Sequence, residues 1–429
     1  MSCYFRLRNR LFASFYALFY FLMKVKNRFL SKTTKTRGKE LKKNHTFQLP
    51  RLPRSPEQAE INGVNWIGLL RAENGIGQSQ RNLIDAARTT DLDISCADLS
   101  YVCPARAKDT QWSNLSKNLV KGRKTIFHLN PPDVPSVIRC LGKKVFQLGP
   151  NIGYWAWELP DLPKSWLQSV ETYSEVWTPS VFCANTFRKA LTIPVRVVPI
   201  SIRTPDEINN VSHMKRIRRE LGLPPDGFLF GTIFDVNSTL SRKNPLGGVS
   251  AFKKAFTKED NCYLVVKVNC SKKTQTLRKL ARLFEDSKKY NIILINEVWD
   301  RERINAFLKC IDAYISLHRS EGFGMPIAEA MGFGKCVIAT GWSGNMDFLD
   351  KTNGFPVEYS LVSIEEQDGP YEVGNQWADP DINHAAECMR ICYQNQDYSE
   401  QLGIQAHRDI KKKYSPKIIG SILQKILTA

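Results

Sequence analysis

Two glutamates eight positions apart flank a glycine-rich turn in the last third of the chain. Glu321 and Glu329 lie in the segment SEGFGMPIAEAMGFGKCVIAT, directly after the apolar run DAYISL. The run predicts a buried strand, and Pro326 favours the first turn of a following helix. Backbone amides at such a helix start, aided by the helix dipole, form an anion site that suits a diphosphate. Glu329 can then accept hydrogen bonds from ribose hydroxyls, and Glu321 can face a sugar. The alternative is a tight turn with ordinary helix glutamates.

Arg242 and Lys243 form a cationic pair in the segment TIFDVNSTLSRKNPLGG, just before a helix that begins at Asn244-Pro245. Two cations stabilising a departing diphosphate would do the work that a metal ion does in other enzymes. No Asp-x-Asp pair lies where a metal-dependent enzyme would need one, so we expect neither a metal nor another cofactor. The alternative is a solvated Arg-Lys pair.

Glycines and polar residues also follow predicted strands in the first half of the chain. Gly75 and Gly77 lie in the loop RAENGIGQS after the run VNWIGLL, and His128 and Asn130 follow the run KTIFHL. The carboxyl ends of parallel strands share one edge of a sheet, so these residues are expected to face one cleft. The alternatives are a tight turn for the glycines and a core or capping histidine for His128.

The segment NIGYWAWELPDLP at 151–163 places Trp155 and two more aromatic residues beside Glu158 and Asp161. An aromatic strand end can stack on the face of a sugar, which makes Trp155, Glu158 and Asn130 candidates for the acceptor side. The alternative is a hydrophobic lid over the first domain.

Short apolar runs alternate with helical patterns over most of the chain, which is typical of parallel sheets with crossover helices. A polar break near 201–226 separates two such arrays. We therefore predict an α/β protein with two Rossmann-like domains, at 61–203 and 204–400, facing each other across a cleft. Helices at 401–429 are expected to follow, with the option of packing back on the first domain. Strands are expected at 64–70, 93–99, 124–129, 144–149, 175–180, 195–200, 228–235, 262–268, 291–297, 312–317 and 335–340.

The segment from Ser320 onward resembles family 4 glycosyltransferases of the GT-B fold, also described as glycosyl transferase group 1. Their signature is a pair of glutamates separated by seven residues around a glycine-rich turn. The resemblance extends over about 60–400, but only this segment is highly specific. Two departures are Lys335-Cys336, where the family usually has a proline after the lysine or cysteine, and Asn237, where many members carry an arginine. The matching residues are Glu321, Gly322, Phe323, Gly324, Pro326, Glu329, Ala330, Met331, Gly334, Val337, Ile338, Ala339 and Thr340.

The resemblance implies a retaining, metal-independent sugar transfer with the donor held mainly by the second domain. In such enzymes the second glutamate binds the ribose, the first lies by the sugar ring, and the cationic pair grips the diphosphate. A histidine in the first domain often contacts the reacting sugar. The catalytic candidates are thus Glu321, His128, Lys243 and Arg242, and the donor-binding candidates are Glu329, Gly322, Phe323, Gly324, Met325, Gly75 and Gly77.

The first 60 residues are strongly basic, with 14 Lys and Arg against three acids. The apolar stretch at 11–23 is too short to span a bilayer, and bases flank it on both sides. We expect residues 1–43 to lie on an anionic membrane surface, with an uncleaved signal anchor and a dispensable leader as alternatives. Eleven scattered cysteines without a CxxC pair indicate a reducing compartment. The predicted location is the cytoplasmic face of a membrane.

These features predict a hexosyltransferase that uses a nucleotide-diphosphate sugar and a glycan or lipid-linked acceptor, as in polysaccharide biosynthesis. A GT-B phosphorylase or epimerase is a second enzyme class, and a catalytically inactive sugar-binding or scaffold subunit is the alternative outside enzymes. A nucleic-acid partner is not expected, because the basic leader lacks interleaved aromatic residues.

Overall fold

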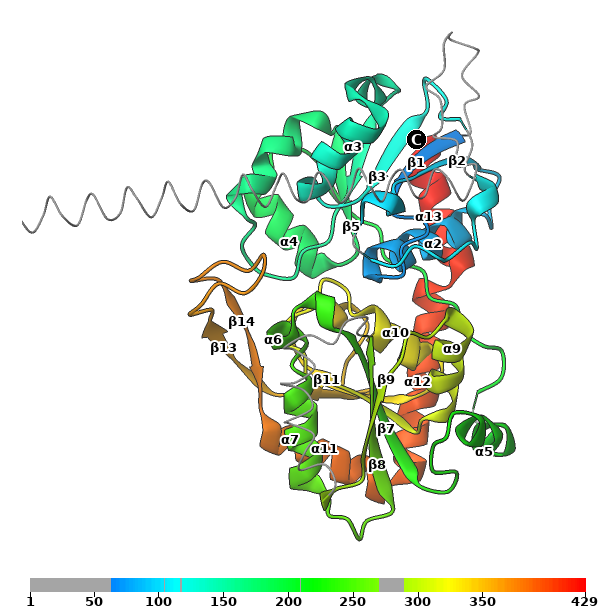
Figure 1. Cartoon of the computed structure of the whole chain (residues 1–429), viewed down its shortest axis with the longest axis vertical. Helices are drawn as coiled ribbons and strands as arrows, with labels where there is room; N and C mark the ends of the chain where they lie inside the picture. Colours follow the sequence, from blue (N-terminus) through cyan, green and yellow to red (C-terminus); the bar gives the residue numbers. More distant parts are fainter. Residues whose placement is uncertain (1–62, 104, 116–117, 209, 270–288) are drawn as a thin grey trace, which may run out of the picture.

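The computed structural model describes residues 63–103, 105–115, 118–208, 210–269 and 289–429. They form two α/β units stacked along the longest axis of the molecule (Figure 1), each built around a six-stranded parallel sheet. The predicted class, two Rossmann-like units facing each other, is confirmed. The basic leader at 1–60 lies outside the described residues.

The first sheet has the strand order β2-β1-β3-β4-β5-β6, with every neighbouring pair parallel. Its central strands are buried on both faces, which explains why their sequences are continuous apolar runs rather than alternating patterns. The strands are β1 (Gly63–Gly68), β2 (Asp93–Asp98), β3 (Lys124–His128), β4 (Asn151–Tyr154), β5 (Glu175–Thr178) and β6 (Val195–Val197).

One predicted strand, at 144–149, is wrong. These residues overlap a 3₁₀ helix at Lys143–Gln147, which follows Gly142 in a backbone conformation with φ of 76°. Val145 and Leu148 are buried and three positions apart, which is the period of a 3₁₀ turn and not of a strand. The fourth strand of the sheet is β4, whose start at Asn151 comes after this helix.

The second sheet has the order β12-β11-β10-β7-β8-β9 and is also parallel. The chain starts in the middle, at β7, and adds strands first on one side and then on the other. This reversal places the ends of β7 and β10 side by side, which is where doubly wound sheets bind ligands. The strands are β7 (Phe228–Asp235), β8 (Cys262–Asn269), β9 (Ile292–Asn296), β10 (Ala313–Ser316), β11 (Cys336–Thr340) and β12 (Phe355–Val357).

Helices cover both faces of the second sheet, and each face has its own apolar core. One core joins the sheet to α5, α9, α10 and α12, and the other joins it to α7 and α11. The helices of the first unit are α2 (Gly75–Ala87), α3 (Val134–Leu141) and α4 (Val181–Ala190). Those of the second are α5 (Val211–Glu220), α6 (Leu240–Lys243), α7 (Pro245–Ala255), α9 (Arg301–Cys310), α10 (Met325–Gly332), α11 (Ile382–Gln394) and α12 (Gln396–Tyr414).

The last helix, α13 (Pro416–Thr428), leaves the second unit and packs on α2 of the first (Figure 1). Ile419 and Leu423 are fully buried in the apolar cluster around β1 and α2. Gly420 lets the two helices approach closely, because a Cβ there would lie 2.3 Å from the carbonyl oxygen of Ala86. The C-terminal helix therefore ties the two units together.

A two-stranded antiparallel hairpin lies outside both large sheets. It consists of β13 (Tyr359–Ser363) and β14 (Gln376–Pro380), and it is inserted between β12 and α11. In Figure 1 it extends along the edge of the second unit toward the first.

Within the described ranges, no helix combines the length and the apolar character needed to cross a bilayer. The apolar stretch at 11–23 lies outside these ranges.

Replacing Gly420 by alanine tests the close packing of α13 on α2. We expect Gly420→Ala to lower the free energy of unfolding by about 1–3 kcal/mol, because the new Cβ overlaps the backbone of α2. Gly248→Ala on α7 is the matched control, since its Cβ would meet no heavy atom of the described chain within 4 Å. The control should stabilise by up to about 1 kcal/mol. Urea unfolding measures the free energy of unfolding of both variants. Equal changes in the two variants would contradict the close packing of α13 on α2.

Candidate active site

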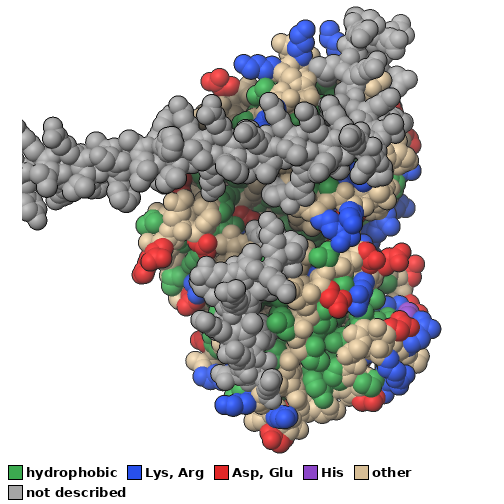
Figure 2. Space-filling view, viewed as in Figure 1, with side chains coloured by type: hydrophobic (Ala, Val, Ile, Leu, Met, Phe, Trp, Pro, Cys, Tyr) green, Lys and Arg blue, Asp and Glu red, His purple; other side chains and the backbone are tan. Residues whose placement is uncertain are grey.

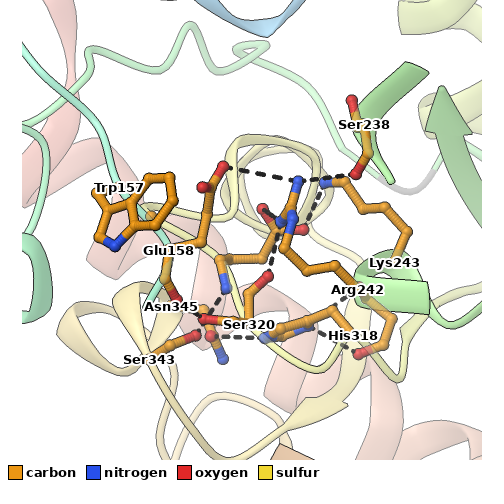
Figure 3. Close-up of polar contacts among 12 residues, drawn as sticks. Trp157, Glu158, Ser238, Arg242, Lys243, His318, Ser320, Ser343 and Asn345 are labelled. Carbon is orange, nitrogen blue, oxygen red and sulfur yellow. Dashed lines mark hydrogen bonds and ion pairs between the residues drawn. The ribbon is translucent and has the colours of Figure 1, made fainter. Parts of the chain in front are cut away.

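A cluster of charged side chains lies after the carboxyl ends of β7 and β10. Figure 3 shows its polar contacts, including that of Arg242 with Glu158 of the first unit. Glu321 follows β10, and Arg242 and Lys243 form the end of the short helix α6 after β7. Glu321 is 78 positions from Lys243 in the sequence, and the pairing of β10 with β7 brings it to the cationic pair.

The carboxylate of Glu321 is held by both members of the cationic pair. Lys243 Nζ donates to Glu321 Oε1 at 2.5 Å, and Arg242 Nη1 lies 3.2 Å from Oε2. The side chains of Arg242 and Lys243 are only 4% and 15% exposed. The pair is therefore part of a desolvated ion cluster and not a solvated surface pair.

Arg242 has partners in both units. In the second unit, its Nη1 donates to the carbonyl oxygen of Ser320 at 2.7 Å, and its Nη2 donates to that of Ser238 at 3.2 Å. The same Nη2 lies 3.7 Å from Oε1 of Glu158, which belongs to the segment after β4. One guanidinium thus contacts carboxylates from both units.

Burial and mutual attraction compete in setting the protonation of this cluster. Burial by itself would raise the pKa of Glu321, but Lys243 and Arg242 outweigh it and lower that pKa to about 2. Burial lowers the pKa of Lys243, and Glu321 opposes that shift. For Arg242 burial also favours the neutral form, yet Glu158, Tyr371 and Glu321 raise its pKa. Glu321 and Arg242 are therefore charged at neutral pH.

The glycine-rich turn has the geometry that an anion site needs. Gly324 adopts φ of 88° and begins α10, and no side chain caps this helix start. Gly344, in the loop after β11, packs against the turn so closely that a Cβ would lie 2.3 Å from the carbonyl oxygen of Gly322. The start of α10, which no side chain caps, adds a positive dipole end beside the cluster. The ring of Phe323 is buried against Phe348 and contributes to packing.

Three residues other than glycine have positive φ in the described part of the chain, and all three lie in loops around this cluster. Thr239 and Asn244 flank α6, and Ser343 lies in the loop after β11. Such conformations cost free energy and persist where the surroundings impose them, often at functional sites. Asn244 donates to the carbonyl oxygen of Leu317 at 2.9 Å, which fixes α6 beside the end of β10.

His318 is a buried residue beside the cluster that was not predicted from the sequence. It is fully buried, its Nε2 lies 3.0 Å from Asn345 Oδ1, and its carbonyl oxygen accepts a hydrogen bond from Thr340. Burial lowers its pKa. The backbone amide of Glu321 donates to Ser343 Oγ at 2.9 Å. The position of His318 two residues after β10 was the available signal.

Glu329 lies apart from this cluster and faces a larger cavity. Arg301, at the start of α9, pairs with Glu329 Oε1 at 2.8 Å. Both residues line a cavity of about 570 Å³ that is bordered by Gln78 and Asn82 of the first unit. Charged side chains of both signs border the boundary between the units in the space-filling view (Figure 2). Sequence reasoning missed Arg301, because α9 gives no motif that marks it.

The glycines of the first loop differ in what they do. Gly77 permits close backbone contact, because a Cβ would lie 2.2 Å from the carbonyl oxygen of Ala72. Its amide donates to the side chain of Asn74, which caps α2. Gly75 faces open space. Asn82, farther along α2, lies 3.8 Å from the sulfur of Met325, so α2 does approach the start of α10.

His128 and Trp155 do not face a cleft. His128 is 1% exposed, its Nε2 lies 2.7 Å from Ser79 Oγ, and its ring stacks on that of Tyr154. Burial lowers its pKa to about 3. Trp155 is fully buried among the aromatic rings of the first core, including Phe187. For His128 the buried placement corresponds to the core alternative, and Trp155 lies within the apolar core of the first unit rather than at a sugar-binding surface.

Of the acceptor-side candidates, Glu158 alone joins the ion cluster. Asn130 accepts a hydrogen bond from the amide of Ala156 at 3.0 Å and so shapes the 155–163 segment. Ser320 Oγ donates to the carbonyl oxygen of Glu158. Glu158 is therefore attached to the second unit through both its backbone and its side chain.

The two units also meet directly at the glycine-rich turn. Ser180, the N-cap of α4, donates to the carbonyl oxygen of Gly322 at 2.6 Å, and the amide of Val181 donates to Asp347 at 2.8 Å. A cavity of about 10 Å³ lies beside Lys243 and Glu321, which is about the space of one water. The side chains of the cluster are thus largely enclosed by the described residues.

Among the described residues, no three His, Cys, Asp or Glu side chains are grouped so that they could hold a metal ion.

Comparison with known proteins agrees with the resemblance stated above. Residues 216–361 match the family model described as glycosyl transferases group 1, a segment that includes Arg242, Lys243, Glu321 and Glu329. No curated protein matches the chain.

Solved structures similar to this chain have the GT-B fold, which confirms the predicted fold. Alr3699/HepE from Anabaena, solved in complex with UDP-glucose, has a TM-score of 0.62 at 12% identity and covers 85% of this chain and 99% of its own. A glycosyltransferase from Rickettsia africae ESF-5 has a TM-score of 0.61 at 14% identity, covering 86% and 98%. A sucrose-phosphate synthase from Thermosynechococcus elongatus has a TM-score of 0.59 at 11% identity, covering 85% and 98%.

Replacing Glu321 by glutamine tests the ion cluster in the folded protein. The pKa of Glu321 is about 2, below its ordinary value of 4.5. Its stabilising contribution is therefore complete above about pH 4.5 and is lost as the pH falls toward 2. Glu321→Gln leaves two buried cations without their carboxylate, so we expect it to lower the free energy of unfolding by about 3 kcal/mol at pH 7.

Urea unfolding at pH 7 and pH 3 measures this effect, and the difference from the wild type should shrink at pH 3. Glu302→Gln, at an exposed position on α9, is the matched control and should have little effect at either pH. A Glu321→Gln effect that is the same at both pH values would contradict the lowered pKa.

Proposed function

We propose that this protein is a glycosyltransferase that moves a hexose-type sugar from a nucleotide-diphosphate sugar to a glycan or lipid-linked acceptor. We propose further that the transfer retains the configuration at the anomeric carbon and needs no metal ion. The observation that carries the proposal is the buried cluster of Arg242, Lys243 and Glu321 beside the uncapped start of α10. It lies within the segment that matches glycosyl transferases group 1.

The cationic pair suits the diphosphate of the donor. Lys243 and Arg242 each hold a different oxygen of the Glu321 carboxylate, and phosphate oxygens accept the same charge-assisted hydrogen bonds. In the proposed reaction the bond between the anomeric carbon and the diphosphate oxygen breaks while the bond to the acceptor oxygen forms on the same face. Both cations stabilise the charge that develops on the leaving diphosphate. The leaving phosphate takes the acceptor's proton, so no separate base is required.

The larger cavity suits the nucleoside part of the donor. Glu329 has a carboxylate that can accept two hydrogen bonds from ribose hydroxyls, and it borders a cavity of about 570 Å³. Arg301 would have to share or release this carboxylate on donor binding. The complex of HepE with UDP-glucose makes that compound the first donor to try, although the identity of 12% carries only the fold.

The role first expected of His128 has less support than that of the cationic pair. Its side chain is enclosed by Trp66, Ser79 and Tyr154, so a contact with sugar would need the first unit to rearrange. We propose instead that the sugar lies between Glu321 and the first unit, with Glu158 on the acceptor side.

A catalytically inactive sugar-binding or scaffold subunit is the second candidate. The observation in its favour is the closed cluster, in which carboxylates neutralise the two cations and only about 10 Å³ is left beside them. An enzyme must open this cluster to admit a donor, whereas a scaffold need not. Nucleotide release from a donor by the purified protein separates the two.

We also propose that residues 1–43 bring the enzyme to the cytoplasmic face of an anionic membrane. The proposal rests on their basic composition around an apolar stretch, and a lipid-linked acceptor would fit that location.

The function is tested by incubating the full chain with a panel of UDP-glucose, UDP-N-acetylglucosamine and GDP-mannose and measuring the free nucleotide released. We expect slow hydrolysis of one donor in the absence of an acceptor and a rise in melting temperature with that donor. Absence of both effects for every donor would favour the scaffold.

Replacing Lys243 by alanine should lower the turnover of that donor by about 100-fold, because one partner of the developing diphosphate charge is lost. Lys254→Ala, at an exposed position on α7, removes the same charge away from the cluster and should leave turnover unchanged. Nucleotide release at saturating donor measures both variants. Equal turnover of Lys243→Ala and the wild type would exclude a role of Lys243 in stabilising the leaving diphosphate.

Replacing Glu329 by alanine should weaken binding of the donor's nucleoside diphosphate by about tenfold or more, as expected for loss of hydrogen bonds to a charged group. Isothermal titration calorimetry with the free nucleotide measures this. Glu302→Ala on α9 is the control at an exposed glutamate. Unaltered affinity of the Glu329 variant would exclude its ribose role.

A further inference from the structure

The hairpin of β13 and β14, with its connecting residues 364–375, belongs to one unit by connectivity and to the other by packing. Ile364, Tyr371 and Trp377 are each less than 10% exposed and lie in the same apolar cluster as the core of the first unit. Asn375 donates to the carbonyl oxygen of Asp161 at 3.1 Å. The hairpin therefore bridges the two units beside the ion cluster.

Tyr371 is the residue through which this hairpin touches the charged groups. Its hydroxyl donates to Glu158 Oε2 at 3.2 Å, and its ring lies 5.9 Å from the guanidinium carbon of Arg242. The ring also contacts Trp157 at 5.5 Å between centroids and is only 3% exposed. One rigid side chain thus contacts a carboxylate of the first unit and a cation of the second.

The distances indicate what the hydroxyl of Tyr371 does. The other oxygen of Glu158 lies 3.7 Å from Arg242 Nη2, which is longer than a hydrogen bond. Glu321 is closer, at 3.2 Å from Nη1. Glu158 therefore lies near Arg242 without a direct hydrogen bond to it. The hydroxyl of Tyr371 holds the other carboxylate oxygen of Glu158, Oε2.

The guanidinium of Arg242 has a nitrogen that a carboxylate could still contact. Its Nε is buried and has no hydrogen-bond partner among the described residues, so the guanidinium is held through its two Nη atoms alone. A carboxylate that moved closer would find a free donor on the same guanidinium. A shift of Glu158 toward Arg242 would therefore add a contact to this guanidinium.

We propose that Tyr371 is a positioning residue that holds Glu158 away from a direct hydrogen bond with Arg242, and so keeps Arg242 available for the diphosphate of the donor. This inference rests on the proposed function, because it concerns the group that would bind the leaving diphosphate. Without the hydroxyl, Glu158 closes on Arg242, and two carboxylates then compete with the diphosphate for one cation.

The experiment is a double-mutant cycle on nucleotide release from the donor that the panel identifies. Tyr371→Phe removes the hydroxyl and keeps the ring against Arg242. We expect it to lower turnover about tenfold, which corresponds to about 1.4 kcal/mol in activation free energy. Glu158→Gln removes the competing charge, so on this background Tyr371→Phe should change turnover less than twofold. Tyr359→Phe, on the same hairpin but 40% exposed, is the matched control and should behave as the wild type.

Two outcomes overturn the inference: a Tyr371→Phe variant as active as the wild type, and a tenfold loss that persists on the Glu158→Gln background. The second outcome also identifies a purely structural role, because a loss of stability would act on both backgrounds. A wild type that releases nucleotide from no donor refutes the proposed function and this inference with it. An active wild type with an unchanged Tyr371→Phe variant refutes the inference alone.

Discussion

The buried ion cluster around Glu321 is the constraint on which the rest of the site depends. A carboxylate and two cations taken out of water are stable only if each is paired and hydrogen-bonded. Here the pairing requires β10 beside β7, α6 fixed by Asn244, and the turn at Gly322 pressed against Gly344. Among the described residues, the three with positive φ that are not glycine lie in these loops, so the backbone is strained where the charges are gathered.

The same cluster couples the two units. Glu158 enters from the first unit, Tyr371 enters from a hairpin of the second, and Ser180 holds the glycine-rich turn from α4. On the opposite side of the molecule, α13 crosses back to pack on α2. Two separate sets of contacts therefore join the units, one at the ion cluster and one where α13 packs on α2.

The sequence predicted the fold well because parallel strands that are buried on both faces have continuous apolar sequences. The run 228–235 coincides with β7, and most other strands agree within one or two residues. The failure at 144–149 has a physical reason, since a short apolar stretch satisfies both a strand and a 3₁₀ turn that buries every third residue. The pairing of Glu321 with Arg242 and Lys243 is consistent with the motif, because residues after neighbouring strands meet at one sheet edge.

The sequence by itself determined the two α/β units and the types of charged group at the ends of β7 and β10. The apolar runs mark the strands, and the residues that follow each run along the chain are read directly. Only the tertiary structure decided which of these groups meet. It turned His128 and Trp155 into the first core, joined Glu329 to Arg301, and brought Tyr371 to Glu158 across 213 positions of sequence. Such contacts depend on the direction of each side chain and on how the two units dock, and no local pattern of residue types encodes either.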